Sequence, residues 1–289
     1  MYSLSKIPIG VYEKAFPSED SLEQLLASAK QIGYDFVELS IDESPARLER
    51  LFWSHTERAR LRQAIFDLDM PIWGMGISAH RKFPLGSASP EIRQKGLDIL
   101  YRSIELAADL GVKAIQIMGY DAFYEPSTKN TQACYLDGLR EGVRWASAAG
   151  IMLGLENGDH ELVDSVEKTM HFVNILNSPW FQAYPDIGNM TAAGYSPLKE
   201  LPLAAGHILG VHVKDTRPGE LRGVPLEQGI VPFMETFRLL ARMGFASPLV
   251  IEMWAHLDPT GNPLDAVAQA RLKVNQWIAE AWSDPTLRN

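Results

Sequence analysis

Four polar side chains interrupt apolar, strand-like runs in the second half of the sequence. They are Glu156 in LGLEN, Asp186 in AYPDIGN, His212 in GVHVKD and Glu252 in LVIEMW. Residue alternation around His212 places its imidazole on the strand face opposite to the neighbouring valines. Three carboxylates and one imidazole form a mixed oxygen and nitrogen set that suits a divalent ion such as Mn²⁺, Co²⁺ or Zn²⁺.

Burying these groups together requires a counter-charge. Desolvating three neighbouring carboxylates without one costs several kcal/mol for each ion and raises their pKa values. Taken alone, a Glu at a strand end is more often a salt-bridge partner in a loop, and a His in a strand is more often a packed core residue. The coincidence of four such residues in consecutive strands favours a metal site over these separate structural roles.

The elements that must position these residues alternate along the chain between short strand-like runs and longer amphipathic ones. Strands are predicted at residues 7–12, 34–40, 71–78, 113–119, 151–156, 181–187, 208–214 and 248–254. Helix-like segments lie between them, for example residues 21–33, 91–111, 138–150 and 231–244. Each of these segments ends in Gly, which is typical of a left-handed residue at a helix C-terminus.

Strict alternation of strand and helix predicts a parallel sheet, because parallel neighbours need a crossover connection. Closure into a single (β/α)₈ TIM barrel domain over residues 1–289 is the simplest outcome. The rival is a doubly wound open sheet, but the sequence after the first strand lacks its G-x-G-x-x-G fingerprint. In a barrel the functional residues lie at the carboxyl ends of the strands, so the four polar residues would meet at one mouth.

Composition and charge limit which binding partners and which cellular compartment are expected. The chain has 289 residues, a formal net charge of -9 and one cysteine, Cys134. An acidic protein repels a phosphate backbone, so nucleic acid is not an expected partner. A lone cysteine fits a reducing compartment, and we expect a cytoplasmic protein. There is no apolar run of about 18 residues and no signal-peptide core at the start, so neither a membrane span nor export is expected.

Six stretches together resemble the xylose isomerase-like TIM barrels, and within them the sugar-phosphate 3-epimerases that act on L-ribulose 5-phosphate and L-xylulose 5-phosphate. The stretches are IPIGVYEKAFP, YDFVELSIDES, ISAHRKFPLGS, NSPWFQAYPDIGN, GVHVKDTRPG and LVIEMW. The resemblance covers nearly the whole chain, and SAHRKFPLG and HVKDTRPG are its most specific parts. A homodimer is also implied by the resemblance.

The resemblance implies that Glu156, Asp186, His212 and Glu252 bind one divalent metal ion, which could be Mn, Co, Zn or Mg. It further implies that Glu156 and Glu252 act as the acid/base pair. One would remove the proton α to the C2 carbonyl of a ketopentose 5-phosphate, giving a cis-enediolate, and the other would return a proton to C3 from the opposite face.

Two asparagines differ from the residues that related epimerases carry at the same positions. Asn157 stands where the compared epimerases usually carry an apolar residue, and Asn189 stands where epimerases of free ketohexoses carry a histidine. The second difference favours the phosphorylated substrates, and Asn189 is expected to contact the substrate.

Cationic residues that follow two of the predicted strands are candidates for binding the rest of the substrate. His80 and Lys214 are expected to face it, and the candidates for its phosphate are Arg81, Lys82 and Arg217. Each of them could equally be a solvated loop residue.

Three other functions fit parts of the pattern. An aldose–ketose isomerase would use the same metal site for transfer between C1 and C2. An apurinic-site endonuclease normally needs a multinuclear cluster with extra histidines, and the predicted fourth strand ends in IMGYDAFYE without one. A sugar-binding protein without catalysis would bind through Glu156 but show no turnover.

Overall fold

The computed structural model describes residues 7–283, and its central feature is a parallel sheet of eight strands. Each strand falls at one of the predicted positions. The strands are β1 Ile9–Tyr12, β2 Phe36–Ile41, β3 Ile72–Ile77, β4 Ala114–Met118, β5 Met152–Glu156, β6 Phe181–Ala183, β7 Val211–Val213 and β10 Leu249–Ile251.

The sheet curls until its two edge strands meet. Its order is β6-β5-β4-β3-β2-β1-β10-β7, so β6 and β7 are the edges. Two parallel bridges join them, Ala183 with Ile208 and Asp186 with His212. The amide of His212 donates to the Pro185 carbonyl at 2.9 Å, as part of this closure. The predicted (β/α)₈ barrel is therefore confirmed.

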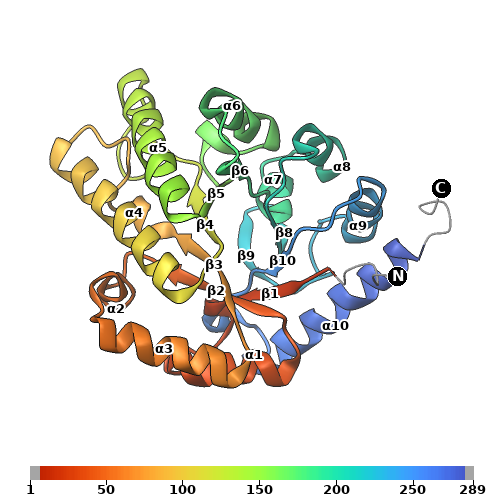
Figure 1. Cartoon of the computed structure of the whole chain (residues 1–289). Helices are drawn as coiled ribbons and strands as arrows, with labels where there is room; N and C mark the ends of the chain where they lie inside the picture. Colours follow the sequence, from red (N-terminus) through yellow and green to blue (C-terminus); the bar gives the residue numbers. More distant parts are fainter. Residues whose placement is uncertain (1–6, 284–289) are drawn as a thin grey trace, which may run out of the picture.

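Helices surround the strands on the outside (Figure 1). The long ones are α1 Leu22–Ile32, α3 His55–Leu68, α4 Pro90–Leu110, α5 Lys129–Ala149, α6 Val166–Leu176, α9 Phe233–Arg242 and α10 Pro263–Trp282. Short helices α2 Pro45–Glu49, α7 Ile187–Ala192 and α8 Pro197–Glu200 lie in connections. Within residues 7–283 none of the helices combines the length and apolar content that a bilayer span requires.

Local sequence signals explain the helix ends. Gly33, Gly111 and Gly150 follow α1, α4 and α5 with φ of 94°, 78° and 71°, the left-handed conformation that a side chain disfavours. Helix α5 begins earlier than its predicted segment, because the Thr128 hydroxyl accepts a hydrogen bond from the amide of Thr131 and caps the helix there.

Strand side chains divide between two layers. Those that point outward pack against the helices in one large apolar core. Inside the barrel, Tyr12, Phe36, Tyr184 and Val250 form a separate buried cluster. A Cβ at Gly10 would lie 2.1 Å from the Phe36 ring, so glycine is needed there for the ring to fit.

Two features near the barrel mouth differ from the predicted strands. Strand β6 ends at Ala183, short of the predicted residue 187, because Pro185 has no N–H to donate to a ladder. Asp186 instead forms the N-cap of α7. After β7, the chain forms an antiparallel hairpin of β8 Asp215–Arg217 and β9 Glu220–Val224, which the sequence analysis did not predict.

Candidate active site

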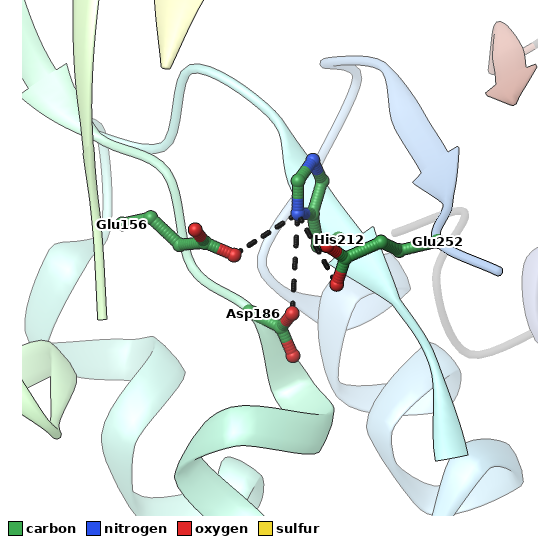
Figure 2. Close-up of side chains that lie close together, drawn as sticks. All are labelled: Glu156, Asp186, His212 and Glu252. Atoms are coloured by element: carbon green, nitrogen blue, oxygen red, sulfur yellow. Dashed lines mark hydrogen bonds and ion pairs between the residues drawn. The ribbon is translucent and has the colours of Figure 1, made fainter. Parts of the chain in front are cut away.

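The four polar residues predicted from the strand ends converge at the mouth of the barrel. Glu156 ends β5, Asp186 precedes α7, His212 lies in the middle of β7, and Glu252 directly follows β10. Each offers one ligand atom, and these atoms all lie within 4.8 Å of one another. Figure 2 shows the three carboxylates pointing at one ring nitrogen of His212. From that Nδ1, the distances to Glu156 Oε1, Asp186 Oδ2 and Glu252 Oε2 are 3.0, 3.9 and 3.8 Å.

This arrangement fits a divalent ion. The donor set of three carboxylate oxygens and one imidazole nitrogen suits such a cation, and the donors are packed closely enough to share one. Asp186 Oδ2 is also buried and accepts no hydrogen bond among residues 7–283, although it forms an ion pair with Lys214 Nζ at 3.1 Å. A buried carboxylate oxygen with a single ion pair can accept a further cation, and a metal ion at this point would stabilise it.

The second ring nitrogen of His212 is held by a buried carboxylate. Its Nε2 lies 2.7 Å from Glu38 Oε1, and the Tyr184 hydroxyl donates to Glu38 Oε2 at 2.8 Å. A carboxylate on one nitrogen keeps the proton there and leaves the other nitrogen free to bind a metal. Gly74 makes room for this carboxylate, since a Cβ there would lie 2.7 Å from Glu38 Oε2.

Polar groups also hold the Glu156 carboxylate. Gln116 donates from Nε2 to Glu156 Oε2, and Asn189 Nδ2 lies 3.4 Å from Glu156 Oε1. Sequence analysis missed Glu38 and Gln116. Both interrupt apolar strands, FVELSI and AIQIM, and this is the same signal that singled out His212.

A lysine lies at one side of the cluster. Lys214 Nζ is 3.1 Å from Asp186 Oδ2 and 3.0 Å from Glu252 Oε2. Burial lowers the pKa of Lys214, but Asp186 and Glu252 outweigh this and raise it above its ordinary value, so the ammonium stays charged. Lys214 therefore pairs with two of the four candidate ligands. The other two, His212 and Glu156, contact each other. The lysine therefore neutralises part of the cluster without bridging all of it.

Protonation of the metal-free cluster follows from burial and charge. Burial raises the pKa of Asp186 well above its usual range, although Lys214 opposes this. Burial also favours protonation of Glu252, but Lys214 and His212 outweigh it and lower the pKa of Glu252 to about 2. Burial alone would lower the pKa of His212, yet Glu38 and Glu156 raise it well above its ordinary value. Without a metal, His212 is thus held protonated, and metal binding must release protons.

A cavity opens directly onto this cluster, and only some of the predicted substrate residues line it. Lys214, Asn189 and Arg81 do. Further lining residues that the sequence analysis did not assign to the site include Tyr12, Lys14, Ser78, Met118, Arg222 and Trp254.

The other three predicted substrate residues do not line this cavity. His80 is buried, its Nε2 lies 3.2 Å from the Gly96 carbonyl, and burial lowers its pKa to about 4. Lys82 is exposed. Arg217 donates from Nε to the carbonyl of Gln228, in the segment after β9, at 2.8 Å. The structure therefore separates these residues from the acidic cluster.

The fold and the site together define a class: (β/α)₈ barrels with a carboxylate and histidine centre at the mouth. The family model described as "Xylose isomerase-like TIM barrel" matches residues 26–278, and the chain belongs to this family.

Known proteins narrow the class further. The chain is 43% identical over 279 residues to L-ribulose-5-phosphate 3-epimerase UlaE of Salmonella typhimurium (strain LT2), with 96% of this chain and 98% of the relative covered. Among solved structures, an L-ribulose 3-epimerase superposes with a TM-score of 0.81 at 20% identity, covering 98% of each chain. D-psicose 3-epimerase from Clostridium cellulolyticum H10 superposes with a TM-score of 0.81 at 17% sequence identity. The superposition covers 94% of this chain and 99% of that one. At these identities, the two structures show a shared fold.

Proposed function

We propose that the protein is an isomerase that epimerises a ketopentose 5-phosphate at C3 and interconverts L-ribulose 5-phosphate and L-xylulose 5-phosphate. The observation that carries this proposal is the 43% identity, over nearly the full length of both chains, to relatives named L-ribulose-5-phosphate 3-epimerase. The two glutamates at the barrel mouth supply the groups that such a reaction needs.

Inversion at C3 requires one base and one acid on opposite faces of the substrate. The C2 carbonyl acidifies the proton on C3, so a carboxylate can remove it and leave a cis-enediolate. Glu156 and Glu252 take these two roles, and they exchange roles in the reverse direction. Gln116 and Asn189 orient the carboxylate of Glu156, and Lys214 holds that of Glu252.

One divalent cation fits between Glu156, Asp186, His212 and Glu252, and we propose Mn, Co, Zn or Mg as the ion. It would supply positive charge that stabilises the developing enediolate. Removing comparable stabilisation from other enzymes costs about 10²- to 10³-fold in rate. We therefore expect chelation to abolish most of the activity. Adding back each of the four ions in turn tests which of them restores it. Full activity of a protein shown to be free of metal would contradict a catalytic role for the ion.

The reaction itself is tested by product identification. Purified protein with added Mn²⁺ should convert L-ribulose 5-phosphate into L-xylulose 5-phosphate, and Glu156→Gln and Glu252→Gln should each remove this activity while keeping the fold. An aldose phosphate as the product would instead identify an aldose–ketose isomerase. Binding of the sugar phosphate without any conversion would identify a binding protein, and cleavage of abasic DNA would identify an endonuclease.

Lys214 and Asn189 complete the proposed substrate site, because both line the cavity beside the glutamates. His80, Lys82 and Arg217 are not carried into the proposal, since their side chains lie elsewhere. We further propose one barrel domain, a homodimer and a cytoplasmic location. The resemblance to the epimerases supports the dimer, and the single cysteine supports the compartment. Light scattering on the purified protein tests the dimer.

A further inference from the structure

The cavity beside the acidic cluster is too small for the proposed substrate. Its volume is about 40 Å³, which holds about three water molecules. A ketopentose phosphate has several times as many non-hydrogen atoms as this space can take. At least one side chain of the cavity wall must therefore move before C2 and C3 of the sugar reach Glu156 and Glu252.

A second and larger cavity, here called the rear cavity, lies directly behind part of this wall. Its volume is about 270 Å³. Lys214, Glu252 and Trp254 line both cavities, so these three residues form the partition between them. An apolar cavity of about 150 Å³ can bind benzene, so the rear cavity has room for an indole ring. Its other lining residues include Val224, Leu226, Met253, Leu257, Ala266 and Ala270.

Trp254 is the member of the partition that is free to turn. Lys214 and Glu252 are held together by a buried ion pair at 3.0 Å. The half-buried Trp254 side chain is held by contacts of its ring instead. Lys214 Nζ and the Arg222 guanidinium lie 5.4 and 5.6 Å from the ring centroid, and the Tyr12 ring meets it edge-on at 6.3 Å. Such contacts are weak where the ring is partly exposed, so the cost of leaving them is small.

The backbone on both sides of Trp254 is anchored. The amide of Glu252 donates to the Val213 carbonyl at 3.0 Å, which extends the pairing of β10 with β7. The amide of Leu257 donates to the Trp254 carbonyl at 3.0 Å, at the start of the 3₁₀ helix Ala255–Leu257. The ring can therefore change position by rotation about its side-chain bonds, between staggered rotamers, without displacing the carboxylate of Glu252.

We infer that Trp254 is a gate whose ring turns into the rear cavity when the sugar phosphate binds, and that the space it leaves admits the sugar. The inference rests on the proposed function, because it concerns how that substrate reaches the two glutamates. The apolar lining of the rear cavity favours the ring there, since the turn removes apolar surface from water. The contacts with Lys214 and Arg222 favour the ring at the mouth of the empty enzyme. Occupation of the rear cavity and binding of the substrate are therefore coupled.

Filling the rear cavity should weaken substrate binding. Ala266→Phe places a ring in this cavity from α10, away from the acidic cluster. We expect the affinity of the Mn²⁺-loaded protein for the equilibrium mixture of the two sugar phosphates to fall about tenfold, because the Trp254 ring must then crowd the new side chain. Calorimetric titration measures it. Ala268→Phe, at an equally half-buried position of α10 outside the lining of the cavity, should leave the affinity unchanged.

A double-mutant cycle shows whether this effect acts through the gate. Trp254→Ala removes the ring and with it the need for the rear cavity, so adding Ala266→Phe to Trp254→Ala should change the affinity by less than about twofold. An equal loss in both backgrounds would overturn the gate, and so would the absence of any loss in the parent. Ala270→Leu, one helical turn further along α10, fills the same cavity and takes the place of Ala266→Phe if that variant does not fold.

Fluorine NMR on protein labelled with 5-fluorotryptophan reports on the ring itself. The chain has seven tryptophans, and Trp254→Phe identifies the resonance of Trp254. Saturating sugar phosphate should shift this resonance, and Ala266→Phe should reduce the shift. Turnover with the Trp254 resonance unmoved would refute the gate and leave the proposed function standing. The expected shift and cycle without any conversion of the sugar would refute the reaction and leave the gate standing, and a protein that binds no sugar phosphate would refute both.

Discussion

The contact between Glu38 and His212 decides which ring nitrogen faces the acidic cluster. Glu38 is fully buried, and its two oxygens contact His212 and the Tyr184 hydroxyl. A carboxylate in this position fixes the imidazole tautomer and increases the basicity of the free nitrogen. Glu38 would therefore position His212 for the proposed metal ion without contacting that ion.

Replacing Glu38 by Gln tests this role. The amide can keep one hydrogen bond but removes the charge, and we expect the affinity for Mn²⁺ or Co²⁺ to fall about tenfold to a hundredfold. Calorimetric titration of the chelated protein measures it. Tyr184→Phe, which removes only the hydrogen bond to Glu38, should cause a smaller loss. Unchanged metal affinity in Glu38→Gln would mean that His212 is oriented by other contacts.

Lys214 is an internal cation that would compete with the proposed metal ion for Asp186 and Glu252. In Lys214→Met, the two carboxylates lose their ion pairs at 3.1 and 3.0 Å. Breaking a buried pair typically costs about 3 kcal/mol or more, so the chelated variant should be less stable than the chelated parent by this amount. Adding Mn²⁺ should stabilise the variant more than the parent.

Urea unfolding with and without Mn²⁺ measures both effects of Lys214→Met. Lys113→Met, at an exposed position, serves as the control and should change neither value. Equal stabilisation of parent and variant by the metal would argue that the lysine and the ion occupy independent positions.

At the scale of elements, Asn157 ties the end of β5 to the start of α7. Its Oδ1 accepts from the Asp186 amide at 2.9 Å, and its Nδ2 donates to the Asp186 carbonyl at 3.0 Å. Asn157 is fully buried. This reciprocal pair holds the backbone of a candidate metal ligand, which explains a polar residue where the sequence comparison leads one to expect an apolar one.

Asn157→Ala should lower the free energy of unfolding by about 1–3 kcal/mol, because it leaves the buried Asp186 amide unpaired and leaves the Asp186 carbonyl with only the Met190 amide as a donor. It should also weaken metal binding, since Asp186 loses its support. Chemical denaturation and metal titration measure the two effects, with Gln63→Ala on the exposed face of α3 as a control. A stability loss without any change in metal affinity would limit Asn157 to a structural role.

The 3₁₀ helix Ser78–Arg81 contains a histidine, His80, whose pKa differs between the folded and the unfolded protein. Burial lowers the pKa of His80 from 6.5 to about 4, so the unfolded chain binds a proton at His80 more readily than the folded protein. Stability from this group is complete above pH 6.5 and decreases as the pH falls toward 4. Over this window the loss should be about 3 kcal/mol, from about 1.4 kcal/mol per pKa unit.

Urea unfolding between pH 7 and pH 4 tests this coupling. His80→Gln should show a shallower decrease in stability over that window, and His207→Gln, at an exposed position, should follow the unmodified protein. Identical pH profiles for His80→Gln and the unmodified protein would show that other groups cause the acid sensitivity.

At the scale of the whole molecule, the barrel could be predicted because strand, helix and glycine signals agree along the chain. All eight barrel strands overlap the predicted runs, and the closure between β6 and β7 follows from their number and alternation. The placement of Glu156, Asp186, His212 and Glu252 at one mouth was likewise expected, because parallel strands bring their carboxyl ends to the same edge of the barrel.

What the sequence did not predict depends on contacts between distant segments. Glu38 and His212 are 174 residues apart, and nothing in either strand reveals their pairing. Arg222 was missed because the β8–β9 hairpin was not recognised, so only residues directly after β7 were considered. His80 follows β3 as expected, but its ring packs against α4 at Gly96 instead of facing the cavity.

The account as a whole depends on proton transfer at C3 by Glu156 and Glu252. The most direct measurement is proton NMR of L-ribulose 5-phosphate in D₂O with the metal-loaded protein. We predict that deuterium enters at C3 as L-xylulose 5-phosphate forms, and that Glu156→Gln and Glu252→Gln each prevent the epimerisation. Deuterium confined to C1, or epimer formed without any deuterium at C3, would contradict the account.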